Sequence, residues 1–201
     1  MEVDDRWQET ANTFKQQIII LGSFVLLLWA IEFIDRFIFG GSLDAFGIRP
    51  RTVAGLWGIF TAPLLHGSFQ HLAANTLPFL VLGWLILSTR QLQSFIKISL
   101  IVVVISGLGT WAIGPRSSVH LGASGLIFGY LGFLLLAGYF ERSFRSIALA
   151  VAVFFLYGGM IWGVLPLAAG VSWQAHLFGF VGGGLAAYLV TNGGGEHGRS
   201  N

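Results

Sequence analysis

Four polar side chains interrupt apolar stretches of this 201-residue chain and could do chemistry there: His71, Asn75, Ser124 and His176. A serine hydroxyl becomes a nucleophile only when a base such as histidine lies within hydrogen-bond reach. His71 and Asn75 are four residues apart, so they share one helix face, and both can donate hydrogen bonds to an oxyanion. Together these residue types suit acyl transfer.

Glycines surround Ser124 on both sides. Gly122 and Gly125 flank it and leave its backbone accessible to a substrate chain, and Gly129 and Gly132 continue a stripe of small residues. A helix that starts here supplies unpaired N–H groups and a partial positive charge where an oxyanion would form. The local sequence therefore fits a nucleophile at a helix start.

His176 also lies on a stripe of small residues. Gly179 and Gly183 follow it at i+3 and i+7 and form a small-xxx-small pair, which lets another helix approach closely. Two glycine-faced helices can bring a serine Oγ and a histidine nitrogen to about 2.6–3.2 Å. Because no Asp or Glu is expected at the same depth, Ser124 and His176 would form a dyad.

Each of these residues has a structural alternative. Ser124 could be a packing residue beside glycines, and His176 could be a structural histidine whose hydrogen bonds are satisfied. His71 and Asn75 could form a polar packing cluster. A metal site with His66 and His71 is disfavoured, because the chain has no HExxH motif and no third ligand at a suitable spacing. His120 is expected to face solvent or cap a span.

Composition indicates a polytopic membrane protein. The chain is 55% hydrophobic and 10% charged, whereas soluble domains carry about 25% charged residues. The eleven lysines and arginines are scattered, so no nucleic-acid-binding patch is expected. The absence of cysteine excludes disulfides, thiolate metal sites and a cysteine nucleophile.

Six apolar runs approach the length of about 20 residues that a helix needs to cross a bilayer. They are Gln17–Phe37, Phe69–Ser88, Ser94–Ile113, Leu121–Phe140, Phe144–Leu165 and Ser172–Val190. The fold class is therefore all-α. We expect a cytoplasmic N-terminal segment over residues 1–16, one six-span domain over 17–190, and a flexible tail over 191–201. The long first loop, Ile38 to Ser68, is apolar enough to dip into the interface.

The four polar residues should share one depth in the membrane. Each lies within about six residues of the start of an even-numbered span, and even-numbered spans all run in the same direction. If both termini are cytoplasmic, seven lysines and arginines lie on the inside and four on the outside. This excess on the inside favours a cytoplasmic N-terminus and C-terminus. The shared layer then lies just below the outer surface. Near the outer end of the first span, Glu32 and Arg36 are expected to form an interfacial ion pair.

Three motifs, in this order, resemble those of the rhomboid family of intramembrane serine proteases. They are HGSFQHLAAN from His66 to Asn75, GASG from Gly122 to Gly125, and AHLFGFVGG from Ala175 to Gly183. Each is weak alone, but together, on the second, fourth and sixth spans, they are quite specific. The match covers essentially the whole hydrophobic chain.

The resemblance implies a role for each matching residue. Ser124 would be the nucleophile and His176 its general base, while His71, Asn75 and the Ser124 backbone N–H would form the oxyanion site. His66 would be structural, tying the first loop to the site. The remaining supporting positions that it implies are Gly122, Gly125, Phe128, Gly179 and Gly183.

The resemblance further implies a six-helix bundle whose water-accessible cavity opens to the outer face. The protein's activity would need no cofactor and no metal. Its substrates would be single-span membrane proteins, cut near the membrane edge, and its other partner would be the lipid bilayer. Short loops and the expected topology suggest a bacterial inner membrane. The sequence leaves the oligomeric state open.

Two positions depart from the family pattern. Many members carry Trp-Arg in the first loop, but this chain has Trp57-Gly58 and so lacks a guanidinium that would anchor the loop. Phe128 stands where many members have tyrosine, and it keeps the ring that can stack on His176. The first departure predicts a less firmly anchored loop.

Two other functions compete with proteolysis. A catalytically inactive rhomboid-like protein that binds transmembrane segments is disfavoured, because inactive relatives of enzymes usually lose the nucleophile or the base, and both are present here. A small transporter or channel is disfavoured because the two halves show no convincing repeat and no carboxylate is placed in mid-membrane.

Overall fold

The computed structural model describes residues 2–168 and 170–193, and within them every regular element is a helix. The six long elements are α1 (Glu2–Phe37), α3 (Phe69–Thr89), α4 (Leu92–Ile113), α5 (Ser124–Glu141), α6 (Phe144–Tyr157) and α7 (Trp173–Gly193). The short elements are η1 (Ser42–Phe46), η2 (Ala54–Leu56), α2 (Gly58–Thr61), η3 (Ala62–Leu64) and η4 (Gly158–Val164). The prediction of an all-α bundle is confirmed.

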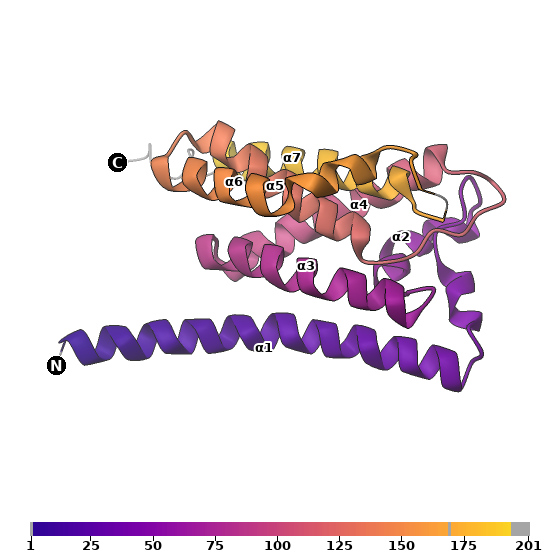
Figure 1. Cartoon of the computed structure of the whole chain (residues 1–201), viewed down its shortest axis with the longest axis horizontal. Coiled ribbons are helices and arrows are strands. Elements are labelled where there is room, and N and C mark those ends of the chain that lie inside the picture. Colours follow the sequence, from indigo (N-terminus) through magenta and orange to yellow (C-terminus); the bar gives the residue numbers. More distant parts are fainter. Residues whose placement is uncertain (1, 169, 194–201) are drawn as a thin grey trace.

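The long helices lie roughly side by side along one axis (Figure 1). Within the described residues, five helical segments are long and apolar enough to cross a membrane: α1, α3, α4, α5 and the continuous run of α6 and η4. The sixth predicted span is α7, which has 21 residues and packs along α4 and α5. The start of α1 and the end of α7 lie at the same end of the bundle, as an even number of crossings requires (Figure 1).

Some helix ends differ from those predicted. Helix α1 is continuous from Glu2 to Phe37, so residues 2–16 are helical and run directly into the first predicted span. Helix α6 ends at Tyr157 and continues as the 3₁₀ segment η4, which begins at the glycine pair Gly158 and Gly159. Helix α7 runs to Gly193, so residues 191–193 of the predicted tail are helical; residues 194–201 lie outside the described part of the chain.

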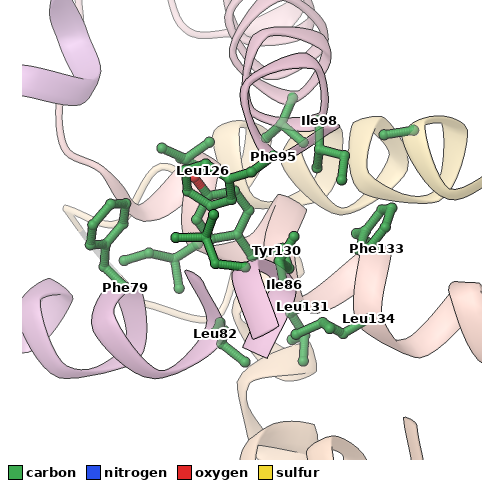
Figure 2. Packing of buried hydrophobic residues seen from close by; sticks show 14 of the residues in the cluster. Phe79, Leu82, Ile86, Phe95, Ile98, Leu126, Tyr130, Leu131, Phe133 and Leu134 are labelled. Carbon is green, nitrogen blue, oxygen red and sulfur yellow. The ribbon is translucent and has the colours of Figure 1, made fainter. Parts of the chain in front are cut away.

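Helix α5 is the centre of the bundle. It contacts α3, α4, α6 and α7, and every residue from Gly125 to Leu134 is buried. Tyr130 lies between Phe79 of α3 and Phe95 of α4, with ring centroids 5.9 and 5.5 Å away (Figure 2). Its hydroxyl is 2.8 Å from Ser99 Oγ, so the polar atom inside this apolar layer is satisfied.

Glycines bring the backbones of α5 and α7 into direct contact. A Cβ added at Gly183 would lie 1.9 Å from the carbonyl oxygen of Gly129, and one at Gly179 would lie 2.1 Å from that of Gly125. In the other direction, a Cβ at Gly132 would lie 2.4 Å from the Phe180 carbonyl oxygen. The predicted small-residue stripes therefore face each other, and neither helix has room for a side chain at these points.

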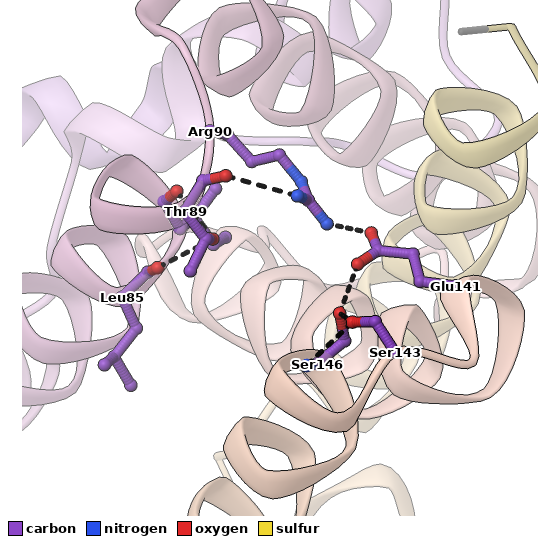
Figure 3. A network of polar contacts seen from close by, with 7 residues as sticks. Leu85, Thr89, Arg90, Glu141, Ser143 and Ser146 are labelled. Carbon is purple, nitrogen blue, oxygen red and sulfur yellow. Dashed lines mark hydrogen bonds and ion pairs between the residues drawn. The ribbon is translucent and has the colours of Figure 1, made fainter. Parts of the chain in front are cut away.

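A polar cluster joins α3, α5 and α6 at the end of the bundle where α1 begins. The Arg90 guanidinium donates to the Thr89 carbonyl oxygen at 3.2 Å and pairs with Glu141 (Figure 3). Ser146 also donates to the Glu141 carboxylate, and Ser143 caps α6 by accepting from the Ser146 amide at 3.1 Å. These contacts fix the turn between α5 and α6 far from the predicted chemistry.

We predict that Gly183→Ala lowers the free energy of unfolding by about 1–3 kcal/mol, because the new methyl group forces the two helices apart. Gly22→Ala on α1 is the matched control, since nothing lies within 4 Å of its Cβ position. Replacing a helical glycine by alanine there is expected to be neutral or slightly stabilising. Unfolding in detergent micelles measures both, and equal stability of the two variants would contradict the close contact.

Candidate active site

The first loop folds back over the site end of the bundle as a series of short helical turns. Gly58, where the family pattern has arginine, packs directly on the backbone of the loop: a Cβ there would lie 2.5 Å from both C and O of Gly47. Thr61 adds a hydrogen bond from its hydroxyl to the Phe46 carbonyl oxygen at 2.6 Å. At this position the loop is held by close backbone packing, and the expectation of a less firmly anchored loop stays a prediction.

A guanidinium does anchor this loop, but it comes from the first span. Arg36 donates to Glu32 at 2.9 Å, to Asp44 of η1 at 3.0 Å and to the carbonyl oxygen of His66 at 3.2 Å. Glu32 and Asp35 are both buried, and Asp35 Oδ1 accepts the Leu43 amide at 2.8 Å. The ion pair expected between Glu32 and Arg36 is therefore present, and it is part of a larger network that holds the loop.

His66 connects the loop to the start of α5. Its side chain is buried, and its Nε2 accepts the backbone N–H of Ala123 at 3.3 Å. Because Ala123 directly precedes Ser124, this bond fixes the backbone at the predicted nucleophile. An acceptor at Nε2 requires an unprotonated ring, and burial, with a smaller contribution from the charge of His71, lowers the His66 pKa to about 3.

His71 and Asn75 lie on the first two turns of α3. Ser68 caps this helix by accepting the His71 amide at 3.1 Å, as serine does at many helix starts. Asn75 is 8% exposed, and its Nδ2 is buried without a hydrogen-bond partner among the described residues. The structure thus leaves a buried amide donor free on the face of α3 that His71 shares.

Gly122 keeps open the space in front of these two side chains. A Cβ there would lie 2.9 Å from His71 Nε2 and 3.6 Å from Asn75 Nδ2. Its φ of +113° is also one that residues with a side chain rarely adopt. Both observations require glycine at this position, and together they place the donors of α3 beside the chain that leads into Ser124.

Ser124 is the first residue of α5 and is half-buried. At a helix start the backbone N–H groups have no partner within the helix and carry a partial positive charge. The Gly122 amide donates to the Ala62 carbonyl oxygen at 2.8 Å, and the Ala123 amide to His66. The two residues before Ser124 are therefore held by the first loop.

His176 lies near the start of α7, where its ring packs on α5. The rings of His176 and Phe128 stack with centroids 4.0 Å apart and an interplanar angle of 5°. Its Nδ1 is 2.9 Å from the Gly163 carbonyl oxygen, so the ring donates Nδ1–H there and carries its lone pair on Nε2. Phe128 is one helical turn from Ser124, so His176 lies on the Ser124 face of α5.

The arrangement has the parts that acyl transfer needs. A serine begins a helix, and a histidine with an available Nε2 stacks one turn along that helix. A second helix presents the unpaired Asn75 amide and the His71 ring beside the chain that leads into the serine. Among the described residues, neither Ser124 Oγ nor His176 Nε2 has a hydrogen-bond partner. Such bonds often form only when a substrate is bound. The carbonyl of Gly163 occupies the position that an orienting carboxylate would take in a triad.

Sequence reasoning missed His120. It was expected to face solvent or cap a span, but it is 8% exposed, and both of its ring nitrogens contact serine hydroxyls. The error has a physical reason: the residues that enclose His120 come from three separate loops, and no local pattern shows that these loops meet.

Comparison with known proteins agrees with this architecture. The fold and the site define a class of protein: a helical membrane bundle in which a serine begins one helix and a histidine stacks beside it. The sequence model of the Rhomboid domain matches residues 53–193. The chain therefore belongs to the rhomboid family, and the resemblance of its three motifs is confirmed.

The curated relatives are mycobacterial. The uncharacterized protein Rv1337 of Mycobacterium tuberculosis is 45% identical over 195 residues, which cover 90% of this chain and 80% of the relative. The uncharacterized protein ML1171 of Mycobacterium leprae is 45% identical over 176 residues, which cover 84% of this chain and 69% of the relative. The shares covered are larger than the matched domain, so the similarity extends beyond residues 53–193.

We predict that Arg36→Gln destabilises the protein by about 3 kcal/mol, because it leaves the buried Glu32 carboxylate without its partner. The double variant Glu32→Gln/Arg36→Gln is the control, since it removes the buried charge together with the guanidinium. It should recover part of the loss in chemical unfolding measured in micelles. A double variant less stable than Arg36→Gln would contradict the pairing.

Burial of His66 predicts a stability that depends on pH. The unfolded chain binds a proton at His66 below its ordinary pKa of 6.5, whereas the folded protein binds one only near a pKa of about 3. Stability is therefore full above pH 6.5 and declines as the pH falls from there toward 3. Unfolding midpoints between pH 7.5 and 4 should fall more steeply for the wild type than for His66→Gln, which keeps an acceptor but does not titrate. Parallel curves would refute this assignment.

Proposed function

We propose that this protein is an intramembrane serine endopeptidase that uses a Ser124–His176 dyad. The observation that carries the proposal is the placement of the His176 ring. It is held between the Gly163 carbonyl and the face of Phe128, with Nε2 available, beside the helix that begins at Ser124. This is the arrangement that a base needs to take a proton from a neighbouring hydroxyl.

In the proposed reaction, His176 accepts the Ser124 proton and the hydroxyl oxygen attacks the scissile carbonyl carbon. The tetrahedral intermediate expels the amine, which takes the proton from His176, and leaves an acyl-enzyme. Water then attacks this ester while His176 takes a proton from it, and the C–O bond to Ser124 breaks. The serine oxygen recovers the proton from His176, and the acid product leaves. Because Nδ1–H stays bonded to Gly163 throughout, the ring keeps its orientation during both proton transfers.

The oxyanion would bind where α3 meets the start of α5. Asn75 contributes an amide group without another partner, His71 contributes a ring nitrogen, and Ser124 contributes its backbone N–H. Donors that are in place before the reaction stabilise the developing charge without reorganisation. Gly122 supports this assignment, because it leaves the space between these donors free of side chains.

The substrate class follows from the location of the site. Because Ser124 begins a helix long and apolar enough to cross a membrane, we infer that the substrates are single-span membrane proteins. A substrate helix must unwind locally to expose its peptide bond, which favours segments with glycine and other weak helix formers. The cut would fall near the membrane edge.

We further propose that the site faces the outside of a bacterial inner membrane. It lies at the end of the bundle opposite the start of α1 (Figure 1). A cytoplasmic N-terminus puts seven lysines and arginines on the inside and four on the outside, and such an excess on the inside favours this orientation. The end of the bundle that carries the site then lies outside. The mycobacterial relatives support a bacterial membrane.

The test is cleavage of a single-span reporter by the purified protein in lipid vesicles, together with labelling by a fluorophosphonate probe. Wild type should cleave and label, and Ser124→Ala and His176→Ala should do neither. Asn75→Ala should lower turnover by about 10²–10³ but leave residual cleavage, as removal of a single oxyanion donor does.

Lys97→Gln, on α4 at the far end of the bundle, is the control and should cleave like the wild type. Cleavage by Ser124→Ala would refute the nucleophile. A folded wild type that neither cleaves nor labels would favour the inactive binding protein.

A further inference from the structure

His120 joins three loops at the site end of the bundle. Its backbone pairs with Ile48 of the first loop through two hydrogen bonds of 2.8 and 2.9 Å. Its ring lies 2.8 Å from Ser118 Oγ in the loop before α5 and 2.7 Å from Ser172 Oγ directly before α7. The loops that lead to the predicted nucleophile and to the predicted base therefore meet at one imidazole.

The surroundings leave room for this ring and little else. A Cβ on Gly114 would lie 2.8 Å from His120 Nε2, and a Cβ on Gly47 would lie 2.6 Å from the His120 carbonyl oxygen. Side chains at these two positions would displace the imidazole or its backbone. The enclosure also lowers the His120 pKa by desolvation, so the ring is neutral near pH 7.

The hydrogen bonds assign the tautomer of His120. The Ser118 hydroxyl donates its single hydrogen to the Pro115 carbonyl oxygen at 2.6 Å, so toward His120 it can only accept. The Nε2 atom therefore carries the hydrogen, and Nδ1 has the lone pair. Ser172 must then donate its hydroxyl hydrogen to Nδ1.

Ser172 transmits this contact to the predicted base. With its hydrogen directed at His120, its Oγ can accept the Ala175 amide, 3.4 Å away, and its carbonyl oxygen accepts the His176 amide at 3.2 Å. Ser172 is thus the residue that begins the first turn of α7 and is itself held by His120. His176 lies at the end of that turn.

We propose that His120 is a positioning residue that sets His176 relative to Ser124 through its bond to Ser172. This inference rests on the proposed function, because positioning matters only if His176 acts on Ser124. His120 touches neither the reacting atoms nor the oxyanion donors. Its effect on the reaction passes through Ser172 and the first turn of α7.

Two amide substitutions separate the two contacts of the ring. The amide of asparagine lies at the position of the ring's Nδ1, so in His120→Asn it can accept the Ser172 hydroxyl but cannot reach Ser118. Glutamine extends to the Nε2 side, so His120→Gln can bond Ser118 but leaves Ser172 without its acceptor. The variants have the same charge and the same functional group, so the pair is matched.

Kinetics of reporter cleavage give the first measurement. His120→Gln should lower kcat about tenfold, the effect of one lost hydrogen bond, with KM within about twofold of wild type. His120→Asn and Ser118→Ala should keep kcat within about threefold. Ser172→Ala should lower kcat at least as much as His120→Gln, because it also removes the contact with the Ala175 amide. Adding His120→Gln to Ser172→Ala should lower kcat no further, because the bond between the two side chains is already absent.

Hydrogen exchange of the Ala175 and His176 amides gives a second measurement that does not require activity. Exchange should be faster in His120→Gln than in wild type and His120→Asn, because the first turn of α7 loses its support. Equal exchange in the two variants, or an equal fall of kcat in both, would overturn the inference. A wild type without cleavage but with the predicted exchange pattern would refute the proposed function and leave His120 as the residue that holds α7.

Discussion

The backbone contact between α5 and α7 sets the geometry of the bundle. Glycines on both helices bring one backbone onto the other, so that a methyl group at Gly183 would overlap the Gly129 carbonyl oxygen. Inside a membrane such contacts gain packing that lipid tails cannot supply. Because the two helices also carry Ser124 and His176, the packing that stabilises the bundle is the packing that brings these side chains to neighbouring surfaces.

At the site end of the bundle, polar side chains join the loops to one another. Arg36 connects α1 to the first loop, His66 connects that loop to α5, and His120 connects α5 to the loop before α7. Buried polar atoms are costly unless they are paired, so these bonds are needed for stability alone. Their consequence is that the backbone on both sides of Ser124 has little freedom to move.

The bundle is not equally packed throughout. Helix α5 is enclosed by four neighbours, whereas α6 has a single buried residue, Val153, and contacts chiefly α5. The η4 segment that follows α6 supplies the Gly163 carbonyl, which holds the His176 ring. The orientation of the predicted base thus depends on the least enclosed part of the structure as well as on the glycine contact.

The class of protein, the approximate spans and the four polar residues of the candidate site could all be predicted from the sequence. Hydrophobic runs and isolated polar residues are local patterns, and motif order indicated the rhomboid family. The contacts that hold the site are visible only in the folded chain. Gly58 packs on Gly47, Arg36 bonds Asp44 of the first loop, and His120 lies buried between serines. These contacts join residues far apart in the chain, and such pairings are decided by how loops meet in space.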